Sequence, residues 1–358
     1  MRADVDLRRL HDGFRRLAAP VFLGALPLVV LGWLVISAHQ RNLVAIDFRG
    51  ELYPEARMVV HGQNPFPPPD ADLSGGVNRI WPIPAALFVA PLTALPPQIA
   101  AYVFTALLTL AFAATLLVLD IRDWRVWGAA FLWPPTLSAI QTANLTIVLG
   151  LFVAVAWRYR SRRFVPGLLI GAAIALKFFL WPLVVWLVAT RRYASALVAS
   201  AIAAASFLLV LPFTGLGSYL ALVRNLSATF DGYSLNVFGF LTQSGVGDGI
   251  AHGVSLVVAG ATLVAAFRLR SLPLTIVACL LFSPIVWMHF YALLVIPLAI
   301  AYPSLNVAWL LPWAMWECPG GWQGVRPWQS ATGVAVLALT VLSLQLKARP
   351  RLRPAPAS

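Results

Sequence analysis

The chain has 358 residues, of which 60% are hydrophobic and only 11% are charged, and its mean hydropathy is +0.81. An average soluble domain carries about a quarter charged residues, so this composition excludes a soluble globular protein. The formal net charge of +13 would suit a nucleic-acid partner, but the arginines cluster between apolar segments without interleaved stacking aromatics. Such a distribution predicts membrane-topology signals and no binding of nucleic acid.

Apolar segments that suit the hydrocarbon core of a bilayer, about 30 Å thick, recur along the chain. Backbone groups in lipid need hydrogen bonds within their own segment, so these segments are predicted to be helices. The first follows an arginine-rich N-terminus and ends without a small-x-small cleavage site, which favours an uncleaved span over a signal peptide. The predicted helices cover residues 17–38, 99–119, 126–141, 145–157, 194–211, 250–267, 272–287, 289–302, 305–316 and 331–346.

One further apolar segment, residues 165–190, lies between two arginine clusters and holds Lys177 near its centre. If both clusters are cytoplasmic, the segment is a hairpin of two half-helices; a single span is the alternative. With the hairpin, most arginines fall on one side of the membrane and most acidic residues on the other, as the positive-inside rule requires. We therefore expect both termini to be cytoplasmic in a multi-pass protein of the cell membrane.

The resulting fold is all-α, a polytopic transmembrane bundle of about 10–12 membrane helices that include short half-helices. Residues 1–346 are expected to form a single transmembrane catalytic domain, and residues 347–358 a basic cytoplasmic tail. Two long loops, about residues 39–80 and 212–249, are expected on the extracytoplasmic side, whereas the inner loops are short and basic. Because polar loop chemistry concentrates in the outer loops, we expect the functional site there.

Three of the carboxylates in the first long loop are evenly spaced. Asp47, Glu51 and Glu55 are spaced i, i+4, i+8, which would place them on one face of a helix lying on the bilayer. A carboxylate held there could take a proton from an acceptor hydroxyl as a general base. A solvated acidic face, paired locally with Arg49 and Arg57, is the alternative that the spacing leaves open.

The loop resembles that of the polyprenyl-phosphate-mannose-dependent mannosyltransferases of glycosyltransferase family 87, membrane enzymes of the GT-C class. Their Asp after the first helix, aromatic residue and Gly-x-x-Pro-aromatic turn correspond to Asp47, Tyr53 and residues 62–66. An aromatic and Pro-rich segment starts at Trp81, although the usual Tyr-Pro-Pro is altered.

Two later motifs are also similar to this family, so that the resemblance spans roughly residues 17–300. A Gly-rich segment, residues 167–171, precedes Lys177, and a Ser-Pro…Trp-x-His motif ends at His289. The resemblance implies transfer of a hexose, mannose in that family, from a polyprenyl-phosphate donor to a glycolipid or lipid-linked glycan acceptor. The transfer would take place on the extracytoplasmic face, in the cell envelope.

By this resemblance Asp47 is the catalytic base. Polyprenyl phosphate is a good leaving group, so one inverting displacement suffices, and its developing charge needs a cation or hydrogen-bond donor. Lys177 and His289 are candidates for that role, since an ionisable residue in a membrane usually serves a function. A lysine that snorkels or caps half-helices, and a merely interfacial histidine, are the alternatives.

Other residues are candidates for substrate contacts. Trp81 would be an aromatic platform for the sugar or a membrane-interface anchor, and the segment Asn144-Leu-Thr146 fits the N-glycosylation pattern, which often matches by chance. The further substrate-binding candidates are Glu51, Tyr53, Arg224 and, more weakly, Asn236.

Neither a cofactor nor a metal ion is expected. The sequence has no phosphate-binding Gly loop, dinucleotide fingerprint or HExxH helix, and its two cysteines have no ligand spacing. Two other functions stay open: transfer of a pentose such as arabinose, and lipid or solute transport. A transporter is expected to show internal repeats and polar pairs at the membrane midplane, but no repeat is evident and Lys177 has no acidic partner within a predicted span.

Overall fold

The computed structural model describes residues 18–75, 79–318 and 325–348, and within these ranges the chain is helical without a β-strand. Four helices are long and apolar enough to cross a membrane, and a broken pair of helices raises the number to five. Large apolar side chains stay exposed along them, as lipid contact requires. The predicted all-α polytopic membrane fold is therefore confirmed. The N-terminal arginines and the tail from residue 349 lie outside the described ranges.

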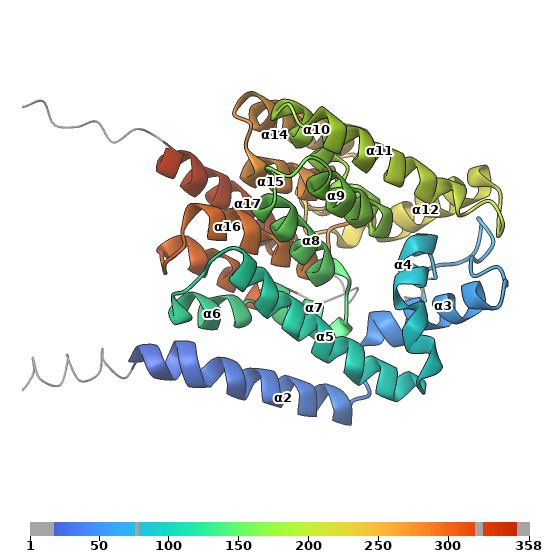
Figure 1. Ribbon diagram of the computed structural model, residues 1–358, viewed down its shortest axis with the longest axis horizontal. Coiled ribbons are helices and arrows are strands. Elements are labelled where there is room, and N and C mark those ends of the chain that lie inside the picture. Colours follow the sequence, from blue (N-terminus) through green and yellow to red (C-terminus); the bar gives the residue numbers. More distant parts are fainter. Residues whose placement is uncertain (1–17, 76–78, 319–324, 349–358) are drawn as a thin grey trace, which may run out of the picture.

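The elements follow one another as η1 (Val21–Ala25), α2 (Leu26–Gln40), η2 (Phe48–Leu52), α3 (Tyr53–Val60), α4 (Ile83–Val89), η3 (Ala90–Ala94), α5 (Pro97–Val118), α6 (Trp124–Phe131), α7 (Pro134–Thr142), α8 (Thr146–Arg158), α9 (Val165–Leu176), η4 (Phe178–Leu180), α10 (Pro182–Ala189), α11 (Tyr193–Leu208), α12 (Leu216–Phe230), η5 (Asp231–Tyr233), α13 (Val237–Gln243), α14 (Asp248–Arg268), α15 (Leu272–Phe282), η6 (Met288–Leu294), α16 (Val295–Ala301), η7 (Val307–Glu317) and α17 (Pro327–Ala348). Helices α3, α4 and α12 lie at one end of the molecule, and the start of α2 and the end of α17 lie toward the other (Figure 1).

Several predicted spans are shorter or broken in the structure, and proline explains the breaks. The predicted helix 126–141 is divided into α6 and α7, because Trp133 precedes Pro134 and adopts an extended backbone. The predicted helix 272–287 ends at Phe282 for the same reason, since Ser283 is extended before Pro284. These breaks leave polar backbone and side chains inside the bundle.

Residues 165–190 form the predicted hairpin. Helix α9 ends at Leu176, and the chain returns through α10, so that Arg192 Nε donates a hydrogen bond of 2.7 Å to the carbonyl of Arg160. The two arginine clusters therefore lie together at one end of the molecule. A single span, which would separate them by the full length of the segment, is wrong.

The hairpin packs tightly on α11. A Cβ atom added at Gly167 would lie 2.4 Å from the carbonyl oxygen of Ser195, and one at Gly171 would lie 3.0 Å from the Cα of Ala199. Small residues four apart allow two helix backbones this close approach in membranes. The glycine-rich segment thus has a packing role, which fixes the position of Lys177 beyond it.

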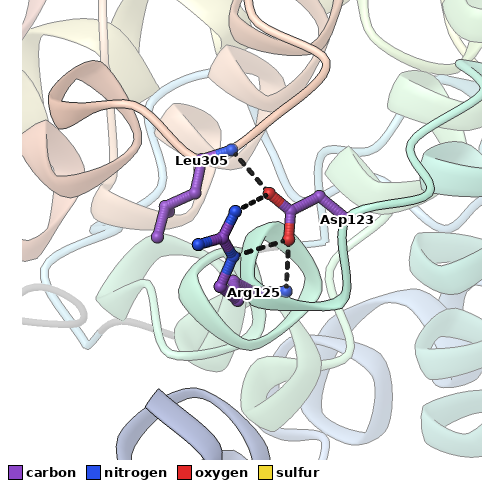
Figure 2. Close-up of polar contacts among 3 residues, drawn as sticks. All are labelled: Asp123, Arg125 and Leu305. Carbon is purple, nitrogen blue, oxygen red and sulfur yellow. Dashed lines mark hydrogen bonds and ion pairs between the residues drawn. The ribbon is translucent and has the colours of Figure 1, made fainter. Parts of the chain in front are cut away.

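Asp123 joins two segments far apart in the sequence (Figure 2). Its carboxylate caps α6 by accepting from the backbone N–H of Arg125 at 3.1 Å, and it also pairs with the guanidinium of Arg125 at 2.9 Å. The second oxygen accepts from the backbone N–H of Leu305 at 2.9 Å. One side chain therefore holds the start of α6 against the segment that leads into η7.

Candidate functional site

The break between α7 and α8 places a buried amide in the middle of the bundle. The chain bends by 115° between the two helices, and Ala143 between them has a left-handed backbone with φ of 54°. Asn144, only 2% exposed, follows it, and its Oδ1 accepts from the backbone N–H of Thr146 at 3.1 Å and from Thr146 Oγ1 at 2.8 Å. The amide oxygen thus binds the first residue of α8, and the NH₂ group is left for another partner.

A second break, at the tip of the α9–α10 hairpin, delivers Lys177 to the same amide. Its backbone is extended, and its Nζ donates to Asn144 Oδ1 at 2.9 Å. The ammonium also lies over two aromatic rings, 4.7 Å from the centroid of Trp81 and 4.1 Å from that of Phe290. Cation–π contacts of this kind hold a partly desolvated ammonium in place.

Asp47 completes the cluster from the first loop. Its Oδ2 accepts from Asn144 Nδ2 at 2.7 Å, and the backbone N–H of Ala45 donates to Gln141 O at 2.7 Å, which fastens this part of the loop to the end of α7. A carboxylate can only accept and an ammonium can only donate. Asn144 must therefore turn its NH₂ toward Asp47 and its oxygen toward Lys177.

Burial and charge oppose each other at Asp47, which lies outside the candidate spans. Burial raises the pKa of its carboxyl above the ordinary value, and the Asn144 hydrogen bond and the positive charge of Lys177 lower that pKa in part. Asp47, Lys177 and Glu51 keep partial exposure, whereas Asn144 and Thr146 are buried. The charged side chains are thus the accessible part of the cluster, and the buried amide of Asn144 lies behind them.

Glu51 and Glu55, the other two of the three evenly spaced carboxylates, both bind Trp81. Glu51 Oε2 accepts from the indole Nε1 at 2.9 Å, and Glu55 Oε2 accepts from the backbone N–H of Trp81 at 3.2 Å. Glu55 is fully buried, and burial raises its pKa well above the ordinary value. The spacing predicted that the three carboxylates share one face, and the structure adds that this face meets the protein interior. A solvated acidic face is wrong for Glu55.

A comparison with known protein families gives one match. A model of glycosyltransferase family 87 matches residues 80–297. The chain belongs to glycosyltransferase family 87. It is a membrane glycosyltransferase. No match was found among the curated proteins or among the solved structures.

The match to family 87 covers part of the cluster. Trp81, Asn144, Lys177 and His289 lie within the matched residues, whereas Asp47 precedes them. The base candidate thus comes from a segment outside the family match and meets the matched segments only through the fold.

His289 lies deep in this family 87 glycosyltransferase. It is 4% exposed in η6, and neither ring nitrogen makes a hydrogen bond within the described residues. The neighbouring Phe290 contacts Lys177 with its ring face. The histidine is therefore enclosed by protein beside the cluster.

The remaining candidates lie farther from the amide. The hydroxyl of Tyr53 donates to Leu95 O at 2.8 Å, which ties α3 to the end of η3. Arg224 is exposed on α12, and Asn236 caps α13 by accepting from the backbone N–H of Gly239 at 2.9 Å. Asn225, on the same helix as Arg224, joins the two long loops by donating to Ala71 O at 2.9 Å.

Sequence reasoning missed Asn144 and Phe290 as members of the site. In the sequence, Asn144 matches only the N-glycosylation pattern, yet in the structure it is buried and its NH₂ group is bound to Asp47. The available signal was an isolated amide between two apolar runs, directly after a proline-started segment. A buried amide needs partners, and that need alone would have pointed to a polar cluster there.

Proposed function

We propose that this enzyme transfers a hexose, mannose by its resemblance, from a polyprenyl-phosphate donor to a glycolipid or lipid-linked glycan acceptor. The observation that supports this most is the meeting of a carboxylate, Asp47, and an ammonium, Lys177, on the two sides of one buried amide. Inverting transfer needs a base for the acceptor and a cation for the departing phosphate. The cluster supplies one of each.

In the proposed reaction the acceptor hydroxyl gives its proton to Asp47 as its oxygen forms a bond to the anomeric carbon. The bond between that carbon and the phosphate oxygen breaks on the opposite face, so the configuration inverts. Polyprenyl phosphate leaves with the electron pair of the broken bond. No covalent sugar-enzyme intermediate is formed, and a single positioned carboxylate is sufficient.

Lys177 and His289 are proposed to stabilise the departing phosphate. Lys177 is held against two ring faces and carries a positive charge toward the partly exposed side of the cluster. The buried ring nitrogens of His289 make no hydrogen bond within the described part of the chain, so the one that carries the hydrogen is free to donate to a phosphate oxygen. Both side chains would act on charge that grows in the transition state.

We further propose that the site faces the extracytoplasmic side and that both termini are cytoplasmic. The arginine clusters meet at one end of the α9–α10 hairpin, and Lys177 lies at the other. Arginine-rich ends favour the cytoplasm. A cysteine at the exposed position Gln63, in the first loop, tests this orientation with a membrane-impermeant thiol reagent on intact cells. Labelling only after permeabilisation would overturn the orientation.

Transfer itself is tested in membranes with radiolabelled polyprenyl-phosphate mannose, glucose and arabinose. We expect the mannosyl donor to be used best by the wild type, and Asp47→Asn to lower transfer by about 100-fold or more, the usual contribution of a general base. Asp72→Asn is the matched control, because Asp72 is an exposed carboxylate in the same loop.

Each other outcome has a defined meaning. Full transfer by a folded Asp47→Asn variant would overturn the role of Asp47. Preferred use of the arabinosyl donor would establish the pentose alternative. Movement of the labelled lipid or sugar without a new glycosidic bond would establish transport and overturn the proposed transferase function.

A further inference from the structure

Asn144 is a buried residue with partners on three other elements of the fold. Its amide contacts Asp47 from the first loop, Lys177 from the hairpin tip and Thr146 at the start of α8. We propose that Asn144 is a positioning residue, which holds the carboxylate of Asp47 and the ammonium of Lys177 in fixed orientation so that they act as one unit. This inference rests on the proposed function, in which Asp47 is the base and Lys177 the phosphate-binding cation.

The geometry assigns a separate role to each half of the amide. Thr146 fixes Asn144 Oδ1 with two hydrogen bonds, of 3.1 and 2.8 Å, so the side chain cannot turn without losing both. Its Nδ2 is then directed at Asp47, and Oδ1 stays available to Lys177. The preceding Ala143 keeps a left-handed backbone that is uncommon for a residue with a Cβ atom. The chain thus adopts an unfavourable conformation at the position that aims this amide.

An amide suits this position better than an ionisable side chain. It donates to a carboxylate and accepts from an ammonium without adding charge, so the attraction between Asp47 and Lys177 is preserved. An aspartate would place a second negative charge beside Asp47, and two adjacent carboxylates compete for one proton. An apolar residue would remove the amide hydrogen bond to Asp47, the largest of the interactions that favour its charged form, and the buried carboxylate would be disfavoured.

The other charged groups around Asp47 do not replace Asn144. Glu51 lies one turn along the loop and also interacts with Lys177, so it competes with Asp47 for the same cation. Arg49, between them in sequence, directs its guanidinium at the carbonyl of Val44, 3.5 Å away. Lys177 itself reaches Asp47 across the amide. Asn144 therefore links the two charged groups, because it donates to Asp47 and accepts from Lys177.

The glycosylation reading of this tripeptide conflicts with the same contacts. Asn144 is 2% exposed, and the Nδ2 atom that a glycan would occupy donates to Asp47 at 2.7 Å. A glycan there would need the core to open. We therefore expect no modification at Asn144.

The test compares Asn144→Leu, Asn144→Asp and Thr146→Val with the wild type, as full-length proteins in detergent. The first readout is the pH dependence of kcat/KM for the polyprenyl-phosphate sugar. The second does not need activity: the pH dependence of carbodiimide modification of Asp47, followed by mass spectrometry, because the reagent attacks the protonated carboxyl. Thr340→Val is the matched control, since it removes an equally buried polar group, a hydroxyl that donates to Val336 O within α17.

We expect Asn144→Leu to move both the acid limb of kcat/KM and the labelling midpoint of Asp47 to higher pH, by about one unit, the usual size of a lost charge-stabilising hydrogen bond. Asn144→Asp is expected to move them at least as far. Thr146→Val, which keeps the shape of the side chain, is expected to give a smaller shift in the same direction. Thr340→Val is expected to leave the limb and the midpoint unchanged.

Unchanged labelling midpoints in folded Asn144→Leu and Thr146→Val would overturn the inference, as would an equal shift in Thr340→Val. If the wild type transfers no sugar from any donor, the proposed function fails. The labelling midpoints then still decide whether Asn144 sets the charge of Asp47, so the two failures are distinguishable.

Discussion

The ammonium of Lys177 lies 4.7 Å from the centre of the Trp81 ring, and Glu51 holds that ring by its indole N–H. Trp81 is only 9% exposed, with one face toward Lys177 and both of its N–H groups bound to carboxylates. Trp81 is therefore placed to orient Lys177. Little of its ring is exposed to contact a sugar, the other role that the sequence left open for it.

Substitutions at Trp81 should therefore act through Lys177. We expect Trp81→Leu to lower kcat/KM by about tenfold, because a desolvated cation–π contact contributes about 1–2 kcal/mol. Trp81→Phe keeps a ring face and should lose less. Purified variants assayed with saturating acceptor provide the measurement. Equal activity of the leucine variant and the wild type would contradict a role in orienting the lysine.

The pH dependence of transfer should report Asp47. Burial raises the pKa of this carboxyl above 3.8, and a base must be deprotonated to act. The rate should therefore rise with pH through the raised pKa and level off above it. A pH profile of kcat/KM measures this limb, with thermal unfolding at each pH as the control for folding. A limb at or below 3.8 would contradict Asp47 as the buried base.

Glu55 should limit stability at high pH. Its folded pKa lies well above 4.5 because the carboxyl is buried, so the folded state keeps a proton that the unfolded state releases. Stability then falls as pH rises from about 4.5 toward the folded pKa, by about 1.4 kcal/mol per unit of pKa difference. Glu55→Gln keeps an acceptor for the Trp81 N–H and should remove this dependence.

The comparison of wild type and Glu55→Gln is made by thermal unfolding in detergent from pH 4 to 9. The variant should gain relative stability as the pH rises. Asp72→Asn, an exposed carboxylate in the same loop, is the control. A constant difference between Glu55→Gln and the wild type across the whole range would mean that Glu55 is ionised in the folded protein.

Asp123 should lose its stabilising effect on the folded protein at acid pH, whereas Glu55 limits stability at high pH. The hydrogen bond from the Arg125 side chain, with those from the backbone N–H groups of Leu305 and Arg125, lowers its pKa from 3.8 to about 2. Its stabilisation is therefore present above pH 3.8 and lost as pH falls through about 2. Asp123→Ala should cost about 1 kcal/mol at neutral pH, the usual value of a helix cap.

Thermal unfolding at neutral pH measures the Asp123 cap, and Asp123→Asn, which can still accept from the N–H groups, should lose less. Arg125→Met separates the ion pair from the cap (Figure 2). If Arg125→Met is as damaging as Asp123→Ala, the ion pair and not the cap provides the stability.

The packing of α9 on α11 should tolerate no side chain at Gly167. An added Cβ would lie 2.4 Å from Ser195 O, so the helices would have to separate, at a cost of about 1–3 kcal/mol. Gly260→Ala is the control, since nothing lies within 4 Å of a Cβ there. Unfolding temperatures of the two variants decide the matter. A Gly167→Ala variant as stable as Gly260→Ala would contradict the tight contact.

Part of the site could be foreseen and part could not. Asp47, Lys177 and His289 stand out in the sequence because ionisable residues beside or within apolar segments carry a high desolvation cost, and the structure gathers them in one region. Asn144 carries only the weaker signal of an isolated amide between two apolar runs, which predicts polar neighbours but does not say which ones. Phe290 carries no signal, because a phenyl ring in a membrane segment is ordinary until its neighbours are known.

The sequence by itself determined that this chain is an all-α membrane protein, because its composition leaves too few polar residues to cover a soluble surface and its apolar segments have the length of membrane helices. It also placed three carboxylates on one side of the first loop. Only the tertiary structure decided that Asp47 and Lys177 both bind Asn144. Asp47 is 97 positions and Lys177 is 33 positions from Asn144 along the chain. Periodicity describes the face of one helix, whereas the meeting of two helix breaks depends on the packing of all the others.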